Sequence, residues 1–165
     1  MLRKLRIPII IVVTAVLTQA VGLAVLAAVP SAFLPNGNTR YAVAQSTSTE
    51  LTWSEGWLPL MSQSINLPAG KTADIMVIFC GNGVANDSHT VLQIKVQIAG
   101  TVASPGIVNF ADVDAAAEGN CFTFYRVGGT AGQVPVRVYW RSSNGTSGYS
   151  VNMYQRSMIV IANIH

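Results

Sequence analysis

The chain has 165 residues, of which half are hydrophobic and only 10% are charged, and its formal net charge is +3. Four of the ten basic residues, Arg3, Lys4, Arg6 and Arg40, lie near the N-terminus. After residue 44 the balance is 6 basic against 7 acidic residues, a net charge of −1. This excludes the strongly basic composition typical of nucleic-acid-binding domains, and we expect no nucleic-acid partner.

The N-terminus has the pattern of an export signal. Three basic residues precede an apolar, uncharged run over residues 7–29, which orients the following chain away from the cytoplasm. The run, from 7 to 29, has 23 residues and is long enough to cross a bilayer as a helix. We therefore predict an extracellular or cell-surface protein with an N-terminal apolar helix. The helix is either a cleaved signal peptide or a retained anchor, and only a retained helix would contact the membrane.

Two sites of small residues could be cleaved, Ala42-Val43-Ala44 and an earlier one around residues 25–27. Residues 30–50 contain prolines and a polar stretch at 45–50, and predict a flexible linker with too little apolar content to pack. The expected organisation is a signal peptide or anchor over 1–29, a linker over 30–50 that is cut if cleavage follows residue 44, and a folded domain over 51–165.

The folded domain has the pattern of an all-β protein. Residues 90–98 and 134–141 alternate between apolar and polar positions, as half-buried strands do, and helix signals are nearly absent. Eight or nine short strands separated by turn residues predict an antiparallel β-sandwich, a jelly roll. The expected strands span residues 53–60, 64–67, 73–80, 90–98, 107–110, 121–127, 134–141, 149–154 and 157–164.

Two of these strands, at residues 75–79 and 158–164, are apolar on both faces. A sandwich buries one face of each sheet, so the outer face of these strands needs a cover, which is the linker, a crossing loop or a neighbouring subunit. We predict self-association of the domain, as a homo-trimer that closes around an axis without leaving open sheet edges.

The second half of the domain resembles a known group. The segment GQVPVRVYWR at 132–141, the polar loop after it and RSMIVIA at 156–162 are similar to the closing hairpin of jelly-roll head domains in bacterial and phage surface proteins, and SINLPAG at 64–70 is similar to an earlier hairpin. These heads are comparable to the tumour-necrosis-factor and complement-globular-head superfamily. The resemblance covers about residues 62 to 164 and implies a trimeric, non-enzymatic domain, but it assigns no ligand residue.

Cys80 and Cys121 are the only cysteines. Two cysteines in an exported domain usually form one disulfide, and we predict that pair; the alternative is two buried free thiols. A metal site is not expected, because two sulfurs without a nearby histidine fall short of four ligands.

No catalytic constellation is evident. Asp87, Ser88 and His89 are adjacent in sequence, whereas members of a catalytic triad come from separate segments, so we interpret them as a polar loop. The acidic cluster of Asp112, Asp114 and Glu118 could contribute oxygens to calcium but lacks the other positions of a calcium loop, which favours a solvated surface. We expect no enzyme activity, cofactor or metal.

Trp53 and Trp57 are the aromatic residues least accounted for by a core, whereas Trp140 shares its strand face with three valines and is expected to be buried. The leading hypothesis is therefore an exported, non-enzymatic jelly roll that acts as a surface or assembly module. The alternative is a carbohydrate-binding module in which Trp53 and Trp57 stack on a cell-surface glycan; a protein partner also remains open. A secreted hydrolase is the third hypothesis.

Overall fold

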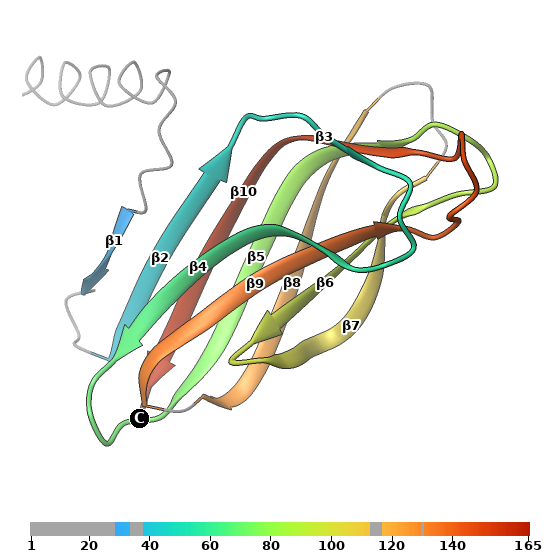
Figure 1. Ribbon diagram of the computed structural model, residues 1–165. Coiled ribbons are helices and arrows are strands. Elements are labelled where there is room, and N and C mark those ends of the chain that lie inside the picture. Colours follow the sequence, from blue (N-terminus) through green and yellow to red (C-terminus); the bar gives the residue numbers. More distant parts are fainter. Residues whose placement is uncertain (1–28, 34–37, 113–116, 130) are drawn as a thin grey trace, which may run out of the picture.

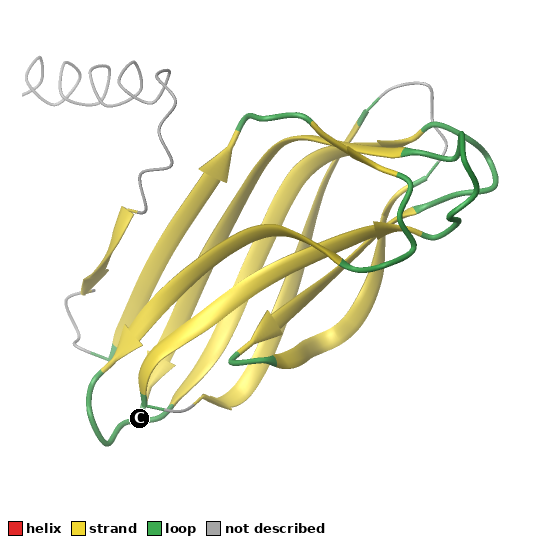
Figure 2. Cartoon of the chain, in the orientation of Figure 1, coloured by secondary structure: helices red, strands yellow, loops and turns green. Residues whose placement is uncertain are grey.

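The computed structural model describes residues 29–33, 38–112, 117–129 and 131–165. Apart from Val29, the predicted apolar helix lies outside these residues. The described part of the chain consists of strands and loops, with no helix long and apolar enough to cross a membrane. The loops gather at the two ends of the strands (Figure 2). This confirms the all-β prediction for the described residues.

Ten strands follow one another along the chain, and their bounds are β1 Val29–Phe33, β2 Thr39–Ser46, β3 Glu50–Thr52, β4 Leu58–Leu67, β5 Ala73–Ala85, β6 Leu92–Ile98, β7 Thr101–Ala111, β8 Glu118–Gly129, β9 Gly132–Ser142 and β10 Val151–Ile164.

The strands form two antiparallel layers (Figure 1). One layer has the order β2-β10-β5-β8 and the other β7-β6-β9-β4, with β1 outside β2 and β3 paired to the end of β10. Most consecutive strands cross from one layer to the other, as the predicted jelly roll requires. We call the two layers the β5 sheet and the β9 sheet.

The core lies between the layers and follows the alternation of each strand. In β6 the apolar residues Leu92, Ile94, Val96 and Ile98 are fully buried, while the intervening polar residues are partly exposed. Burial of each such side chain stabilises the fold by about 1.5–3 kcal/mol. Trp140 is buried in this core, as predicted.

The two layers approach each other at both edges, so the sandwich is nearly closed. On one side, β7 pairs along most of β6 and also with β8 through Ser104 and Tyr125. On the other side, side chains bridge β2 and β4: Gln63 donates to the Val43 carbonyl oxygen at 2.9 Å, and Arg40 donates to the carbonyl oxygen of Asn66.

The structure differs from the expected linker over residues 30–50. Strand β2 pairs with β10 from Thr39 to Ser46, and Ala42 and Ala44 are buried in the core. The sequence signal was weak because alanine buries little area and carries little apolar contrast. Cleavage after Ala44 would remove most of β2 from the sheet.

Arg156 fixes the segment that leads from β2 into β3. Its buried guanidinium donates to the Ser48 carbonyl oxygen at 2.7 Å and to a Glu50 carboxylate oxygen at 3.1 Å. Burial lowers the pKa of the Arg156 guanidinium, and the Glu50 carboxylate opposes that shift. A buried cation with these partners orders a segment whose polar composition had predicted flexibility.

Several predicted strand boundaries also differ, among them those of β5, which continues to Ala85, and β7, which begins at Thr101. The expected strands at 149–154 and 157–164 form the single strand β10, which carries a register shift between Met153 and Arg156. The expected strand at 53–60 is mostly a loop, because the paired segment β4 begins only at Leu58 and continues through 67. A bulge shifts the alternation of buried and exposed residues by one position, so one strand that contains a bulge has the sequence pattern of two strands.

The predicted disulfide is present. Cys80 and Cys121 lie opposite each other on β5 and β8 and are joined through their sulfur atoms. The bond crosslinks two neighbouring strands of the β5 sheet.

Candidate functional site

The outer face of the β9 sheet carries a row of polar side chains from three neighbouring strands. Gln93 on β6 lies between Arg141 on β9 and Asn109 on β7 in the strand register. Arg141 Nε donates to Gln93 Oε1 at 2.9 Å, and Gln93 Nε2 donates to Asn109 Oδ1 at 3.0 Å. These bonds fix the orientation of the amides and the guanidinium before any ligand arrives.

Trp57 lies beside this row. Its ring centroid is 4.3 Å from Lys95 Nζ and 4.6 Å from Arg141 Cζ, and Lys95 Nζ is also 5.6 Å from the centroid of Tyr139. Cations at these distances are attracted to aromatic rings. Trp57 keeps a partly exposed surface. The result is an indole held in place at the surface of the sheet.

The loop that carries Trp57 is attached to the end of β9. The backbone nitrogen of Ser142 donates to the Ser54 carbonyl oxygen at 2.9 Å, and that of Gly145 donates to Glu55 Oε1 at 2.8 Å. A Cβ at Gly145 would lie 2.9 Å from Glu55 Cγ, so a larger residue there would displace the Glu55 side chain. The loop is therefore anchored to the end of β9 at Ser54 and Glu55, shortly before Trp57.

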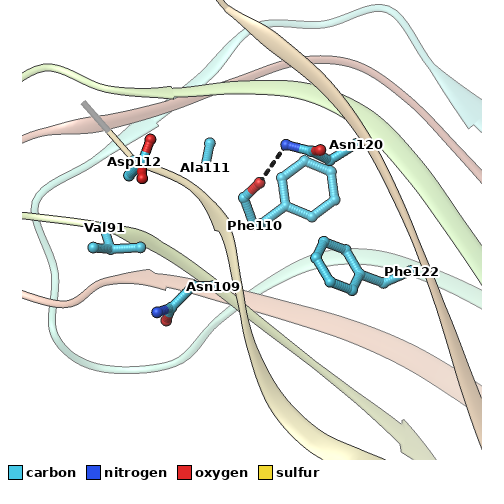
Figure 3. Close-up of a pocket in the computed structure, with 7 residues that line it drawn as sticks. All are labelled: Val91, Asn109, Phe110, Ala111, Asp112, Asn120 and Phe122. Atoms are coloured by element: carbon cyan, nitrogen blue, oxygen red, sulfur yellow. Dashed lines mark hydrogen bonds between the residues drawn. The ribbon is translucent and has the colours of Figure 1, made fainter. Parts of the chain in front are cut away.

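At its β7 end, the polar row leads to a pocket of about 260 Å³ (Figure 3). Asn109 belongs both to the row and to the lining of this pocket, which also includes Asp112, Asn120 and Phe122. Asn120 Nδ2 donates to the Phe110 carbonyl oxygen at 2.7 Å. The pocket opens where β7 and β8 are not paired, since their described pairing is at Ser104 and Tyr125.

The two candidate tryptophans differ in their surroundings. Trp57 is partly buried against two cations, whereas Trp53 is 57% exposed. The structure therefore packs Trp57 against Lys95 and Arg141 on the β9 sheet, whereas Trp53 lies exposed in the loop after β3.

Sequence reasoning missed the polar partners of Trp57. The alternation correctly placed Gln93 and Lys95 on one face of β6, and Tyr139 and Arg141 on one face of β9. What it lacked was the pairing of these two strands, which brings Gln93 opposite Arg141. A search for polar residues on the outward faces of alternating strands could have found the cluster.

The outer face of the β5 sheet has a different character. Its outward side chains are mainly apolar, and Met76, Ile159, Tyr125 and Val127 are 37%, 36%, 54% and 71% exposed. The register places Met76 between Ile161 and Tyr125 across three strands. The two sequence segments that are apolar on both faces thus meet as neighbours, β5 and β10, in one sheet.

Asp87, Ser88 and His89 do not have the geometry of a triad. Asp87 Oδ1 lies 2.8 Å from His89 Nδ1, and Ser88 Oγ lies 3.4 Å from that same nitrogen. In a triad the acid and the hydroxyl contact different ring nitrogens. The exposed His89 ring stacks on Tyr149 with a centroid separation of 5.8 Å.

Of the three residues of the acidic cluster, the structure describes only the side chain of Asp112. Asp112 is exposed and lines the pocket. Asp114 and the side chain of Glu118 lie outside the described part of the structure. Within the described part of the chain, no group of three His, Cys, Asp or Glu side chains could hold a metal ion.

Comparison with known proteins gives a likeness of fold. No protein-family model matches the chain, and no curated protein matches it. Dimeric latent PorU from Porphyromonas gingivalis is 8% identical with a TM-score of 0.52, and the match covers 86% of this chain and 14% of that one. At this identity the similarity concerns the fold alone.

Two smaller domains match with lower TM-scores. The C-terminal domain of EclA, a sugar-binding protein, is 9% identical over 68% of this chain and 78% of that chain, with a TM-score of 0.44. The CBM36-1 domain of a multidomain xylanase from the hindgut metagenome of Trinervitermes trinervoides is 11% identical over 72% and 95% of the two chains, with a TM-score of 0.37.

Proposed function

We propose that this protein is an exported, non-catalytic binding module that binds carbohydrate on the outer face of the β9 sheet. The observation that carries the proposal is the hydrogen-bonded row of Asn109, Gln93 and Arg141 beside the partly exposed ring of Trp57. An aromatic surface flanked by a few fixed polar groups is the usual composition of a small-molecule site.

The chemistry of a sugar fits this arrangement. A pyranose ring has apolar C–H faces, which pack on an indole, and hydroxyl edges, which accept and donate hydrogen bonds. Gln93 and Asn109 carry both donors and acceptors, and Arg141 carries donors in a fixed fork. A ligand lying on Trp57 would therefore meet the amides and the guanidinium in the same row of the sheet.

The test is a polysaccharide pull-down with the protein expressed with its own N-terminal segment. Binding should be lost in Trp57→Ala and retained in Trp53→Ala, which removes an equally large side chain from the neighbouring exposed position. Loss in the Trp53 variant alone would move the site away from the β9 sheet. Retention in both variants would contradict the proposal.

A second candidate function, assembly, rests on the apolar outer face of the β5 sheet. Outward apolar side chains lie on four adjacent strands: Tyr41 and Val43 on β2, Ile159 and Ile161 on β10, Met76 and Ile78 on β5, and Tyr125 on β8. With strands about 4.8 Å apart and a rise of about 3.4 Å per residue, they cover on the order of 300 Å². That is the size of the apolar centre of an interface rather than a complete interface.

The trimer expected from the sequence remains a prediction about this second face. Light scattering at micromolar concentration tests it directly. We expect an oligomer that becomes monomeric in Ile159→Lys, because a charge at the centre of the patch would be buried unpaired in the interface. A wild-type monomer would contradict assembly through this face.

A further inference from the structure

We propose that the ligand of the β9-sheet site is an acidic carbohydrate, a chain that carries carboxylate or sulfate groups. This inference rests on the proposed function and adds the chemical class of the ligand. It follows from how charge is distributed over the outward positions of the β9 sheet.

Three cations project from this face. Lys95 lies on β6, and Arg137 and Arg141 lie on β9, all at outward positions of the alternating pattern. The strand register places Lys95 opposite Tyr139, between the rows of the two arginines. The other outward residues of the central strands β6 and β9 are uncharged: they are glutamines, Tyr139 and Pro135.

None of these cations has an acidic partner within the described residues. The ion pairs there are His89 with Asp87 and Arg156 with Glu50, and both lie away from the β9 sheet. Lys95 contacts the rings of Trp57 and Tyr139 instead.

Only some of the hydrogen-bond donors of the Arg141 guanidinium have an acceptor in the described part of the chain. It donates through Nε to Gln93 and through Nη1 to the Glu55 carbonyl oxygen at 3.3 Å. Its Nη2 has no acceptor among the described residues. Arg137 is exposed, and its guanidinium makes neither a hydrogen bond nor an ion pair with the described part of the chain. Both side chains can therefore accept an anionic partner without breaking a contact of the fold.

The acids nearest the face are at its margins. Glu55 belongs to the loop that carries Trp57, and one of its carboxylate oxygens accepts from the Gly145 backbone. Asp112 lies at the far pocket beyond Asn109. The centre of the sheet, where Lys95 and the arginines lie, is left positive.

This positive face is local and does not reflect the charge of the whole domain. Without Arg3, Lys4 and Arg6, seven of the ten basic residues remain, which balances the seven acidic residues. A domain of zero net charge does not attract anions in general. The attraction is confined to a surface where a sugar-stacking indole is also present, which favours an acidic polysaccharide over other polyanions.

The ligand must also be extended. Arg137 and Arg141 are four residues apart on one strand, so their Cα atoms are about 14 Å apart at a rise of about 3.4 Å per residue. A chain that runs along β9 could place successive anionic groups at Arg137 and then at Lys95 and Arg141. Trp57 would pack on a ring near the Arg141 end.

The experiment compares three probes by calorimetric titration of the full chain: polygalacturonate, which carries carboxylates, dextran sulfate, and uncharged dextran. The variants are Arg137→Gln, which removes a charge from the face, and Lys71→Gln, which removes the same charge from an exposed turn outside both sheets. A duplex DNA of similar charge density serves as a non-carbohydrate polyanion.

We expect binding to one or both acidic probes, and the preferred one identifies carboxylate or sulfate as the recognised group. Arg137→Gln should weaken it about two- to fivefold, as expected for an exposed charge pair, and Lys71→Gln should leave it unchanged. Affinity should fall when NaCl is raised from about 0.05 M to about 0.5 M, because salt screens exposed charges. Trp57→Ala should abolish binding.

Three results would overturn the inference. Binding of uncharged dextran as tight as that of the acidic probes, with no effect of Arg137→Gln, would reject the acidic class and leave carbohydrate binding intact. No binding to any polysaccharide would reject both. Equal weakening by the Arg137 and Lys71 variants, together with equally tight DNA binding, would indicate non-specific attraction to polyanions.

Discussion

The outer faces of the two sheets are built on the same alternating pattern but differ in what the outward positions hold. On the β5 sheet they hold Met76, Ile159 and Tyr125, with a disulfide at one end of the same face. On the β9 sheet they hold Gln93, Lys95, Arg141 and their neighbours, joined by hydrogen bonds and ring contacts. The inner faces of both sheets are mainly apolar, and the buried side chains of Arg156 and Ser142 are exceptions.

Residues of the inner faces stabilise the fold, and residues of the outer faces are available for binding. Inner-face residues contribute to one shared core, whereas each outer face has a chemistry that the fold does not need. An apolar outer face suits contact with another apolar surface, and a polar face with a fixed indole suits a hydrated ligand. Substitutions on the outer face of the β5 sheet should therefore change self-association, and those on the outer face of the β9 sheet should change carbohydrate binding. Substitutions on the inner faces should change both, because they impair folding.

The largest effect should come from placing one charge on the inner rather than the outer face of β10. Val160 is fully buried and Ile159, its neighbour, is 36% exposed. Val160→Asp should destabilise the protein by more than about 4 kcal/mol, because the carboxylate has no partner in the core. Ile159→Asp should cost less than about 1 kcal/mol. Urea denaturation of both variants measures the difference.

If both substitutions destabilise equally at a concentration at which the wild type is monomeric, the outer face of β10 is covered by another segment of the same chain. That result would remove the contrast between the two faces.

Removal of the disulfide should have the next largest effect. The bond closes a loop with a sequence separation of 41 residues. Its loss in a double Cys80→Ser and Cys121→Ser variant should lower the free energy of unfolding by up to about 4 kcal/mol, since the unfolded chain regains loop entropy. Thermal unfolding with and without a reductant measures it. Carbohydrate binding by the folded variant should be unchanged, because the bond lies on the β5 sheet.

Truncation of Trp57 should have a smaller effect on stability. Two cation–ring contacts are lost, which together contribute on the order of 1–2 kcal/mol. Trp53→Ala, at a more exposed position without such contacts, should change the free energy of unfolding by less than about 0.5 kcal/mol. Chemical denaturation of the two variants checks this. Equal losses would mean that Trp57 is not held by the sheet.

The fold could be predicted from the sequence to the extent that burial follows a simple period. Strands β6 and β9 alternate cleanly, and the alternation predicts them nearly to their ends. The pairing of Cys80 with Cys121 could be predicted because an exported domain was expected. Strand β2 was interpreted as a linker because its inward residues are the alanines 42 and 44. Their burial depends on the partner strand β10, which is more than a hundred residues away.

Of the residues in the candidate site, only the tryptophan could be predicted from the sequence. Trp57 could be named, together with Trp53, as unexplained by the core. Gln93 and Asn109 are ordinary polar residues until strand pairing places them in one row. The register between β6, β7 and β9 is set by long-range packing, which no local pattern contains. For the same reason, the lack of acidic partners for Arg137 became visible only in the structure.

The smallest effect concerns the loop end, which belongs to neither outer face. The backbone nitrogen of His89 donates to Asp87 Oδ1 at 2.8 Å, and this bond, followed by the contact with the His89 ring, lowers the pKa of Asp87. A carboxyl group with a lowered pKa in the folded state stabilises the protein above its unfolded pKa, which is about 3.9. That contribution is lost as the pH falls through the lower folded-state pKa.

The stability difference between the wild type and Asp87→Asn should therefore be constant above about pH 5 and shrink towards about pH 2. Urea denaturation across this range measures it, and the difference between the two proteins cancels the titration of the other carboxyl groups. Because Asp87 lies outside both sheets, carbohydrate binding and self-association at neutral pH should not change in this variant. A stability difference that does not vary with pH would mean that the contact between Asp87 and His89 does not distinguish the charged from the neutral carboxyl group. A change in carbohydrate binding would instead extend the candidate site from the β9 sheet to the loop end, where the ring of Tyr149 stacks on His89.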